Sequence, residues 1–297
     1  MSHFHRSPIV VPTDFSAPSL QAVRTARTVA EDDDQITVVH IACDAGIAAP
    51  PFGWSGEFRQ DEYVAGTSEK LQNWIAENGL GNVNAVVRCG DPGLEVCAVA
   101  EATGAKLIVV PSHGRSGMER VLLGSVAERI IRHAECSVLV LRRSIDGCQS
   151  AIADSWCPRH RVVVPVDFSE STERALAVAK ELVDDREEVD VLHVVPHFED
   201  ILIGKKLLTE EIRVESRQSE LEQYLAEHGH TGMRAHALAG DPGTTICDYV
   251  NEVGADTVVI PSHGYQSLDR LIIGSKAERV IRHCTVPVLV LRRHDAE

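Results

Sequence analysis

The second half of this 297-residue chain repeats the first. Residues 106–143 and 256–293 share 20 identities in 38 aligned positions, including Pro-Ser-His-Gly, Gly-Ser-x-Ala-Glu-Arg and Val-Leu-Val-Leu-Arg-Arg. Earlier in each half, Val-Pro-x-Asp-Phe-Ser and Gly-Asp-Pro-Gly recur in the same order. Self-similarity over a long period is the mark of repeated structural units. The chain is therefore expected to form two domains of one fold.

The repeats set the expected domain boundaries. We predict domains at residues 1–143 and 161–297, joined by a polar segment without periodicity at 144–160. Each domain is large enough to bury a hydrophobic core of its own. The offset between matched residues falls from 153 (11 to 164) to 150 (106 to 256), so a small length difference lies near 44–60. That stretch contains several prolines and glycines and is expected to be a loop.

The apolar pattern alternates between strand and helix periods. In the first repeat, strand-like runs occupy 9–11, 36–42, 82–89, 107–111 and 138–141, and helical patterns fall between them, at 20–30, 62–78, from Pro92 and at 124–133. The second repeat follows the same order, with its last strand expected at 286–289. Such alternation builds right-handed βαβ units and a parallel sheet with helices on both faces. The predicted fold class is α/β, with two tandem doubly wound domains of five parallel strands and four helices each.

Charge and hydropathy exclude several classes of protein. The formal net charge of −15 opposes electrostatic binding to nucleic-acid backbones and to anionic lipid surfaces. No apolar run approaches the length of a membrane span, and the first seven residues are too few and too polar for a secretory signal. We expect a cytoplasmic protein that binds neither nucleic acid nor membrane.

The eight cysteines do not form the Cys-x-x-Cys pairs of a zinc ribbon. Most lie inside apolar segments, where a thiol packs as a small hydrophobic group. His40 with Cys43, and His133 with Cys136, offer metal-ligating side chains, but plain packing is the favoured interpretation. No metal site is predicted.

The first strand of each repeat ends near an aspartate. In doubly wound sheets, ligands bind beyond the carboxyl ends of the strands, where the strand order reverses. Pro12 and Asp14 stand there in the first repeat, and Pro165 and Asp167 in the second. A carboxylate at this place can accept a hydrogen bond from a nucleobase amine or a ribose hydroxyl. Alternatively, Asp14 and Ser16 cap the following helix, and the two roles are compatible.

The fourth strand of each repeat runs into a loop that ends at a helix. Pro-Ser-His-Gly, closing at Gly114 or Gly264, is followed by nine residues and then by Gly-Ser at 124–125 or 274–275. A glycine loop that leads into a helix N-terminus offers backbone amides and the positive end of the helix dipole to a phosphate. The alternative is a tight turn and an ordinary helix cap without a ligand. The residue order is not that of a Walker A loop.

Together these motifs resemble the universal stress protein family. The resemblance rests on Pro-x-Asp-Phe-Ser after the first strand, on His-Ile or His-Val in the second strand (His40, His193), on the Gly-Asp-Pro turn, and on Ser-His-Gly-x9-Gly-Ser-x-Ala-Glu-Arg. It covers nearly the whole chain apart from the linker. It implies a tandem member with Rossmann-like domains of the adenine nucleotide alpha hydrolase type. It also implies a pseudo-dimer of the two domains through their fifth strands, with a homodimer as a further option.

The resemblance further implies a binding site for ATP or AMP, with Mg²⁺ as an optional companion. In nucleotide-binding members, residues of the first two strands enclose the adenine, and a Gly-x2-Gly-x9-Gly-Ser/Thr loop holds the ribose and phosphates. Carried onto this sequence, the implied nucleotide-binding residues are Pro12, Asp14, Ile41, Val110, Pro111, Gly114, Gly124, Ser125 and Val126, and in the second repeat Pro165, Asp167, Val194, Ile260, Pro261, Gly264, Gly274, Ser275 and Lys276.

This chain departs from that loop at one position in each repeat. Proline replaces the first glycine, at Pro111 and Pro261, and proline lacks an N–H donor and adds ring bulk near the sugar. The second glycine, the nine-residue spacing and Gly-Ser are kept. The repeats also differ from each other, because Lys276 stands where the first repeat has Val126. A positive charge near a bound phosphate predicts unequal affinities.

Three functions are compatible with this sequence. We favour a nucleotide-binding regulatory or protective factor in stress, read by an unidentified protein partner. The alternative is a nucleotide-independent interaction protein, which Pro111 and Pro261 favour. A slow ATP hydrolase that orients water with His113 or Asp14 is the weakest, because no nucleophile motif or metal cluster accompanies His113 or His263. Local hydrogen bonds are the simpler role for these loop histidines, so we expect a binding protein with no catalytic residues.

Overall fold

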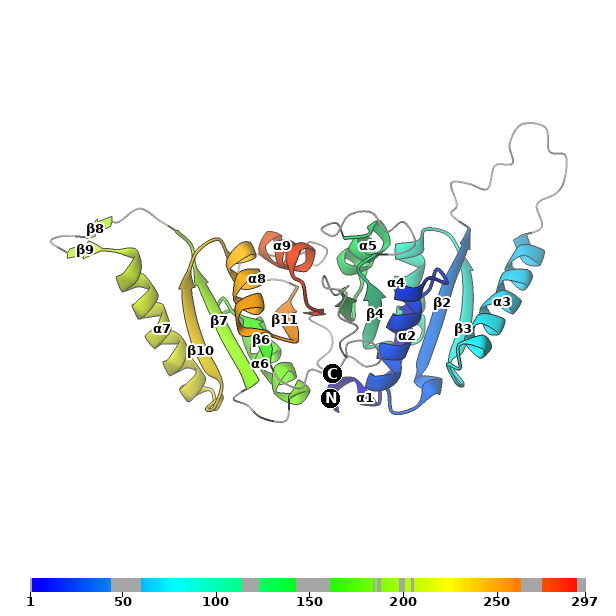
Figure 1. Ribbon diagram of the computed structural model, residues 1–297, viewed down its shortest axis with the longest axis horizontal. Helices are drawn as coiled ribbons and strands as arrows, with labels where there is room; N and C mark the ends of the chain where they lie inside the picture. Colours follow the sequence, from blue (N-terminus) through cyan, green and yellow to red (C-terminus); the bar gives the residue numbers. More distant parts are fainter. Residues whose placement is uncertain are drawn as a thin grey trace, which may run out of the picture. The chain divides into compact units, whose positions relative to one another are not determined.

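The computed structural model describes residues 2–43, 60–113, 123–142, 161–183, 185, 188–197, 201–203, 206–262 and 274–292. They fall into two compact units, which hold Ser2–Leu141 and residues 161–291. Figure 1 shows in each unit a set of parallel strands with helices packed against it. The predicted linker at 144–160 lies outside the described residues, so the domain boundaries stay a prediction.

The first unit begins with α1 (Ser2–His5) and then alternates strands with helices, apart from a short 3₁₀ turn at Asp33–Gln35. In chain order the elements are β1 (Ile9–Pro12), α2 (Ala17–Val29), β2 (Ile36–Cys43), α3 (Gln60–Glu77), β3 (Asn84–Cys89), α4 (Pro92–Ala102), β4 (Leu107–Pro111), α5 (Ser125–His133) and β5 (Ser137–Leu141). The strands pair in parallel in the order β3-β2-β1-β4-β5. The order therefore reverses between β1 and β4.

The second unit repeats this plan. Its elements are β6 (Val162–Pro165), α6 (Glu170–Leu182), β7 (Val189–Val195), α7 (Glu210–Glu227), β10 (Arg234–Ala239), α8 (Pro242–Val253), β11 (Thr257–Pro261), α9 (Ser275–His283) and β12 (Val288–Leu291). The strands pair in parallel in the order β10-β7-β6-β11-β12. Two doubly wound α/β domains are thereby confirmed.

Two details of the second unit differ from the sequence-based expectation. A short antiparallel pair, β8 (Ile201–Ile203) and β9 (Lys206–Leu208), precedes α7 and was not predicted. The last strand begins at Val288 and not at residue 286, because Pro287 has no N–H to give to a strand ladder. The carbonyl of Pro287 still accepts a hydrogen bond from the amide of Val258 in β11, so the proline lies directly before the paired part of the strand.

Buried β-branched residues and well-formed caps explain why these segments fold as they do. Ile9, Val10 and Val11 of the central strand β1 are fully buried, as a strand covered on both faces requires. The carboxylate of Asp91 accepts the amide of Leu94 at 3.0 Å and so caps α4, whose first residue is a proline. Asp241 caps α8 in the same way.

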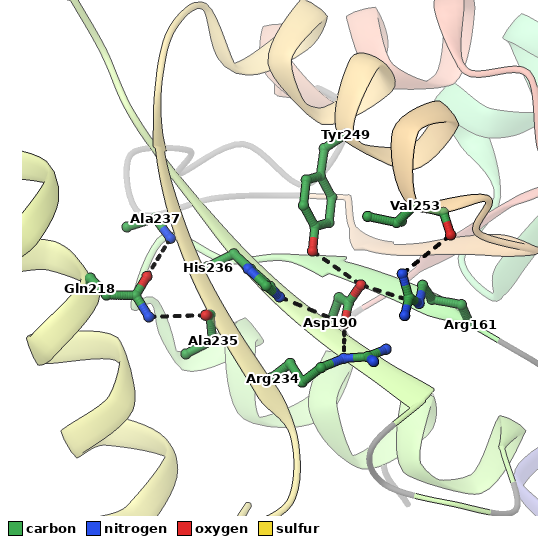
Figure 2. A network of polar contacts seen from close by, with 9 residues as sticks. All are labelled: Arg161, Asp190, Gln218, Arg234, Ala235, His236, Ala237, Tyr249 and Val253. Atoms are coloured by element: carbon green, nitrogen blue, oxygen red, sulfur yellow. Dashed lines mark hydrogen bonds and ion pairs between the residues drawn. The ribbon is translucent and has the colours of Figure 1, made fainter.

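A buried carboxylate distinguishes the second unit from the first (Figure 2). Asp190 of β7 is 1% exposed and lies 2.6 Å from Nε of Arg234, 3.6 Å from Nε of Arg161 and 3.1 Å from the hydroxyl of Tyr249. Burial alone would raise the pKa of Asp190, but the neighbouring His236 and Arg234 outweigh it and hold the pKa below its usual value. The matching residue of β2 is Thr37, which pairs with β1 as Asp190 pairs with β6.

The edge strand β10 is covered by a side chain from α7 (Figure 2). Gln218 donates from Nε2 to the carbonyl of Ala235 at 2.9 Å and accepts the amide of Ala237 at 2.7 Å. One amide side chain thus satisfies backbone groups that an edge strand otherwise leaves open. In the part of the chain that the structure describes, no helix is long and apolar enough to cross a membrane.

Candidate functional site

Several predicted site residues of the first repeat lie where the strand order reverses, whereas Ile41 lies in β2, opposite Arg88 of β3. Pro12 ends β1 beside Val39 of β2, and β1 also pairs with β4, whose last residues are Val110 and Pro111. The amide of Gly124, at the start of α5, donates to the carbonyl of Ser112 at 2.8 Å and so fixes the helix beside the end of β4 (Figure 1). In the second repeat Gly274 donates to Ser262 at 3.2 Å. Gly114 and Gly264 lie outside the described residues.

Asp14 stabilises the turn after β1. Its carboxylate accepts the amide of Ser16 at 3.0 Å, and the side chain of Ser16 in turn accepts the amide of Ser19 and caps α2. The serine, and not the aspartate, is therefore the helix cap. Asp167 accepts the amide of Ser169 at 3.1 Å in the second repeat. Both carboxylates are half-buried at the carboxyl edge of the sheet.

The residue after each aspartate has an unusual backbone. Phe15 has φ of 64° and Phe168 has φ of 59°, and these are the non-glycine residues with positive φ among those described. A bulky residue in the left-handed region costs about 1–2 kcal/mol. The amide of Phe15 is held by the side-chain oxygen of Thr13 at 3.0 Å. A strained conformation repeated at the same place in both domains indicates a functional constraint.

A histidine of the second strand ties the turn to the sheet. Nδ1 of His40 lies 2.7 Å from the carbonyl oxygen of Thr13, and Nδ1 of His193 lies 2.9 Å from that of Val166. A carbonyl can only accept, so Nδ1 carries the proton in both rings. Burial lowers the pKa of His193, which keeps this ring neutral near pH 7.

Each of these histidines also belongs to an aromatic cluster. The ring of Phe15 lies 4.4 Å from that of His40 and meets the ring of Trp74 edge-on at 5.8 Å. In the second repeat, Phe168 lies 4.8 Å from His193 and 5.7 Å from Tyr224. The clusters hold the strained phenylalanines in place.

A cation from the flanking helix approaches each phenylalanine. Nζ of Lys70 lies 4.8 Å from the centroid of Phe15, and the guanidinium of Arg217 lies 6.0 Å from that of Phe168. Sequence reasoning missed these clusters, although the repeated Phe and His were their signal. Trp74 of α3 and Tyr224 of α7 are different residue types, so the comparison of the two repeats did not point to them.

An open cavity of about 390 Å³ lies on the α3 side of Phe15. Its other lining residues all belong to that helix: Gly66, Glu69, Lys70, Asn73, Trp74 and Glu77. None of the predicted nucleotide-binding residues contributes to this lining. The cavity therefore adjoins the turn after β1 but is distinct from the strand ends.

The helices α5 and α9 begin without a side-chain cap. Their N-cap residues are Gly124 and Gly274, with ψ of 145° and 138°. The first amides of a helix have no partner within it, so these two ends offer donors and a positive dipole end to an anion. Ser125 and Val126, and likewise Ser275 and Lys276, are exposed at these ends.

The two glycines differ in the space beside them. A Cβ atom at Gly124 would lie 3.2 Å from the carbonyl oxygen of Ser112, whereas a Cβ at Gly274 would meet none of the described atoms within 4 Å. The φ of Gly274, −58°, is accessible to any residue. Neither backbone conformation nor packing of the described residues therefore requires glycine at 274.

The prolines that depart from the family loop are parts of strands. Pro111 pairs with Leu141 of β5, and Pro261 pairs with Leu291 of β12. Both rings are half-buried. The residues before them, Val110 and Ile260, are buried with 3% and 6% exposed, and Val194 with 8%. The carboxyl edge of each sheet is thus lined by aliphatic side chains.

His113 forms a local contact. Its Nδ1 lies 3.0 Å from the hydroxyl of Ser112, the preceding residue. Within the described ranges, no group of three or more His, Cys, Asp or Glu side chains could hold a metal ion. His263 lies outside the described residues.

Known proteins share both the sequence and the fold. A model of the universal stress protein family matches residues 5–142 and again residues 158–292. A universal stress protein of Mycolicibacterium smegmatis is 28% identical over 297 residues, which cover 96% of both chains. One of Methanocaldococcus jannaschii is 33% identical over 138 residues, covering 46% of this chain and 81% of that protein.

Among solved structures, a universal stress protein from Archaeoglobus fulgidus superposes with a TM-score of 0.62 at 23% identity, over 96% of this chain and 98% of that one. This likeness supports the fold. Because the family model matches most of the chain in two consecutive copies, the chain belongs to the universal stress protein family, as a tandem of two of its domains.

Proposed function

We propose that this protein binds an adenine nucleotide, ATP or AMP, at the carboxyl edge of each sheet and acts as a regulatory or protective binding module. The proposed site lies between β1 and β4 in the first repeat and between β6 and β11 in the second. The adenine lies against the strand ends, and the phosphates lie at the N-termini of α5 and α9. Ligands of doubly wound sheets bind at this place.

The observation that carries the proposal is the helix start at Gly274. Neither φ nor the packing of the described residues requires glycine at 274, and glycine is the residue expected where a ligand approaches the backbone closely. The adjoining amides and the dipole of α9 favour an anion. A phosphate group fits this chemistry, and Lys276 adds a positive charge next to it.

At the other end of the proposed site, the turn after each first strand presents a carboxylate. The strained phenylalanines and the histidine tethers hold Asp14 and Asp167 in place. A fixed carboxylate accepts a hydrogen bond from a ribose hydroxyl or from the adenine amine. Val110 and Ile260, which are 3% and 6% exposed, form the buried apolar layer beneath this edge.

Proline substitution at the first residue of α9 tests the proposal sharply. Proline is tolerated at this helix position and the ψ of Gly274 suits a residue before proline, so Ser275→Pro removes one amide donor and keeps the fold. A lost hydrogen bond to a charged group predicts about 10- to 100-fold weaker ATP binding. Ser275→Ala, which keeps the amide and removes only the hydroxyl, is the matched control and should bind ATP more tightly than Ser275→Pro.

Titration calorimetry of the full chain with ATP measures these affinities, and Ser125→Pro with Ser125→Ala repeats the comparison in the first repeat. Equal affinities of the Pro and Ala variants would contradict a phosphate at the helix starts.

The second candidate function is a nucleotide-independent interaction module. Pro111 and Pro261 favour it, because each places a ring without an N–H at the end of the fourth strand. This function predicts no saturable heat with ATP or AMP in the parent chain. For both candidates we favour a binding role over catalysis.

A further inference from the structure

Two thiols meet between α8 and α9 of the second repeat. Cys247 lies in the middle of α8, and Cys284 is the residue that caps the C-terminus of α9. Their side chains share a hydrogen bond, and the residues are buried, with 7% and 3% exposed. Each sulfur therefore has the other as a close neighbour.

A second contact fixes the same approach. The hydroxyl of Thr285, the residue after Cys284, donates to Oδ1 of Asn251 at 2.5 Å. Asn251 lies one helical turn beyond Cys247, on the same side of α8. The end of α9 is therefore held against α8 at two neighbouring points.

The first repeat carries the same fold with only one of the two thiols. Cys97 takes the place of Cys247 in α4, but the C-cap of α5 is Ala134, where the second repeat has Cys284. Sγ of Cys97 lies 3.9 Å from the carbonyl oxygen of Ile130, and burial raises the pKa of this thiol to about 11. Ala134 at the C-cap of α5 offers no second thiol to pair with Cys97. Cys97 therefore serves as an internal control.

We propose that Cys247 and Cys284 are a site of reversible thiol oxidation, in which a hydroperoxide converts the pair into a disulfide between α8 and α9. The hydrogen bond from Cys284 lowers the pKa of Cys247 and raises that of Cys284. Cys247 is the more exposed of the two residues, at 7% against 3%, and we assign it as the attacking thiol and Cys284 as the resolving thiol.

The reaction balances with a hydroperoxide as the oxidant. The Cys247 thiolate attacks one peroxide oxygen, the O–O bond breaks, and the departing oxygen takes up a proton, which leaves a sulfenic acid on Cys247. The sulfur of Cys284 then attacks the sulfenic sulfur, the S–O bond breaks, and the hydroxide leaves as water with the proton of Cys284. The two thiols give two electrons to the peroxide, and an external dithiol reverses the change by exchange.

Peptide mapping of the full chain tests the proposal. The protein is treated with hydrogen peroxide, alkylated under denaturing conditions and digested with trypsin. We expect a linked pair of peptides, 235–270 with 283–292, which dithiothreitol separates. The number of alkylated thiols should fall by two, and Cys97 should remain alkylated.

Two variants make the assignment specific. Cys284→Ser should abolish the linked pair and leave Cys247 as a sulfenic acid that dimedone traps. Ala134→Cys should create the corresponding linkage to Cys97 in the first repeat. A parent chain whose Cys247 and Cys284 both remain alkylated, or whose Cys247 is oxidised without linkage to Cys284, would overturn the proposal.

Discussion

Nη1 of Arg279 lies 2.7 Å from each carboxylate oxygen of Asp241, the residue that caps α8. The arginine reaches the cap by passing over Gly243, where a Cβ atom would overlap its side-chain carbons. The first repeat has the same arrangement, in which Arg129 pairs with Asp91 across Gly93. The glycine of the Gly-Asp-Pro-Gly turn is therefore required by the arginine of the last helix.

This arrangement predicts that Gly243→Ala destabilises the protein. Alanine favours a helix over glycine, but displacing the packed arginine outweighs that gain, and we expect a net loss of about 1–2 kcal/mol in the free energy of unfolding. In an Arg279→Ala background the overlap is absent, so the same substitution should be neutral or stabilising. Urea denaturation of the four chains measures this difference, and an equal loss in both backgrounds would contradict the contact.

The histidine tether predicts a pH dependence. Burial lowers the pKa of His193, so the folded chain binds this proton less readily than the unfolded chain. The stability that the neutral ring contributes is complete above the unfolded pKa and is lost as the pH falls through the lower folded pKa. His193→Asn keeps a donor for Val166 and does not titrate. The parent should therefore lose more stability than the variant between about pH 7 and pH 5.

Denaturant unfolding at several pH values checks that prediction. The carboxylates and the remaining histidines are the same in both chains, so their contributions to the pH dependence cancel in the comparison. Parallel losses in the parent and in His193→Asn would show that His193 is not held neutral by the fold.

The buried aspartate of the second repeat predicts a large loss of stability. Asp190→Asn leaves Arg161 and Arg234 without their carboxylate, and removing one partner of a buried ion pair typically costs about 3–5 kcal/mol. Both arginines are partly exposed and recover some hydration, so we expect the lower end of that range. Because the pKa of Asp190 is lowered, its contribution is present above the unfolded pKa and is lost on acidification.

Thermal and urea unfolding of Asp190→Asn measure this loss. Thr37→Asn, at the matching position of the first repeat, is the control and should change stability less, since it breaks no ion pair. A similar effect of both substitutions would contradict the role of the network in Figure 2.

The fold could be predicted from the sequence because strand-like apolar runs and helical apolar patterns are both local signals. Runs such as Ile9–Pro12 alternate with helical patterns, and the alternation leads to parallel sheets. The pair β8 and β9 was missed because its strands have three residues each. Pro287 shifted the start of β12, an effect that an apolar run alone does not reveal.

The site was less predictable, because its geometry depends on contacts between distant residues. The aspartates and the glycines at helix starts stood out as repeated motifs. The positive φ of Phe15 and the hydrogen bond from His40 to Thr13 appear only when β1 and β2 lie side by side. Trp74 completes the cluster of the first repeat, and Tyr224 completes that of the second. Both come from helices whose sequences differ between the two repeats.

The difference between the two helix starts predicts unequal nucleotide affinities. Lys276 and Val126 occupy matching exposed positions. Lys276→Val should weaken ATP binding at the second repeat roughly two- to fivefold, as expected for one exposed charge near a helix N-terminus, and added salt should reduce the difference. Val126→Lys should strengthen the first repeat by a similar factor. Calorimetry at two salt concentrations checks both, and identical isotherms for the parent and Lys276→Val would rule out this contribution.

Identification of the small molecules carried by the freshly purified chain tests the central proposal most directly. The protein is denatured, and the released compounds are separated by chromatography and identified by mass spectrometry. We predict ATP or AMP from the parent and a marked loss from the Ser125→Pro, Ser275→Pro double variant, while the matching alanine double variant retains the nucleotide. A parent chain that releases no nucleotide and gives no heat with added ATP or AMP would contradict nucleotide binding and favour the nucleotide-independent interaction module.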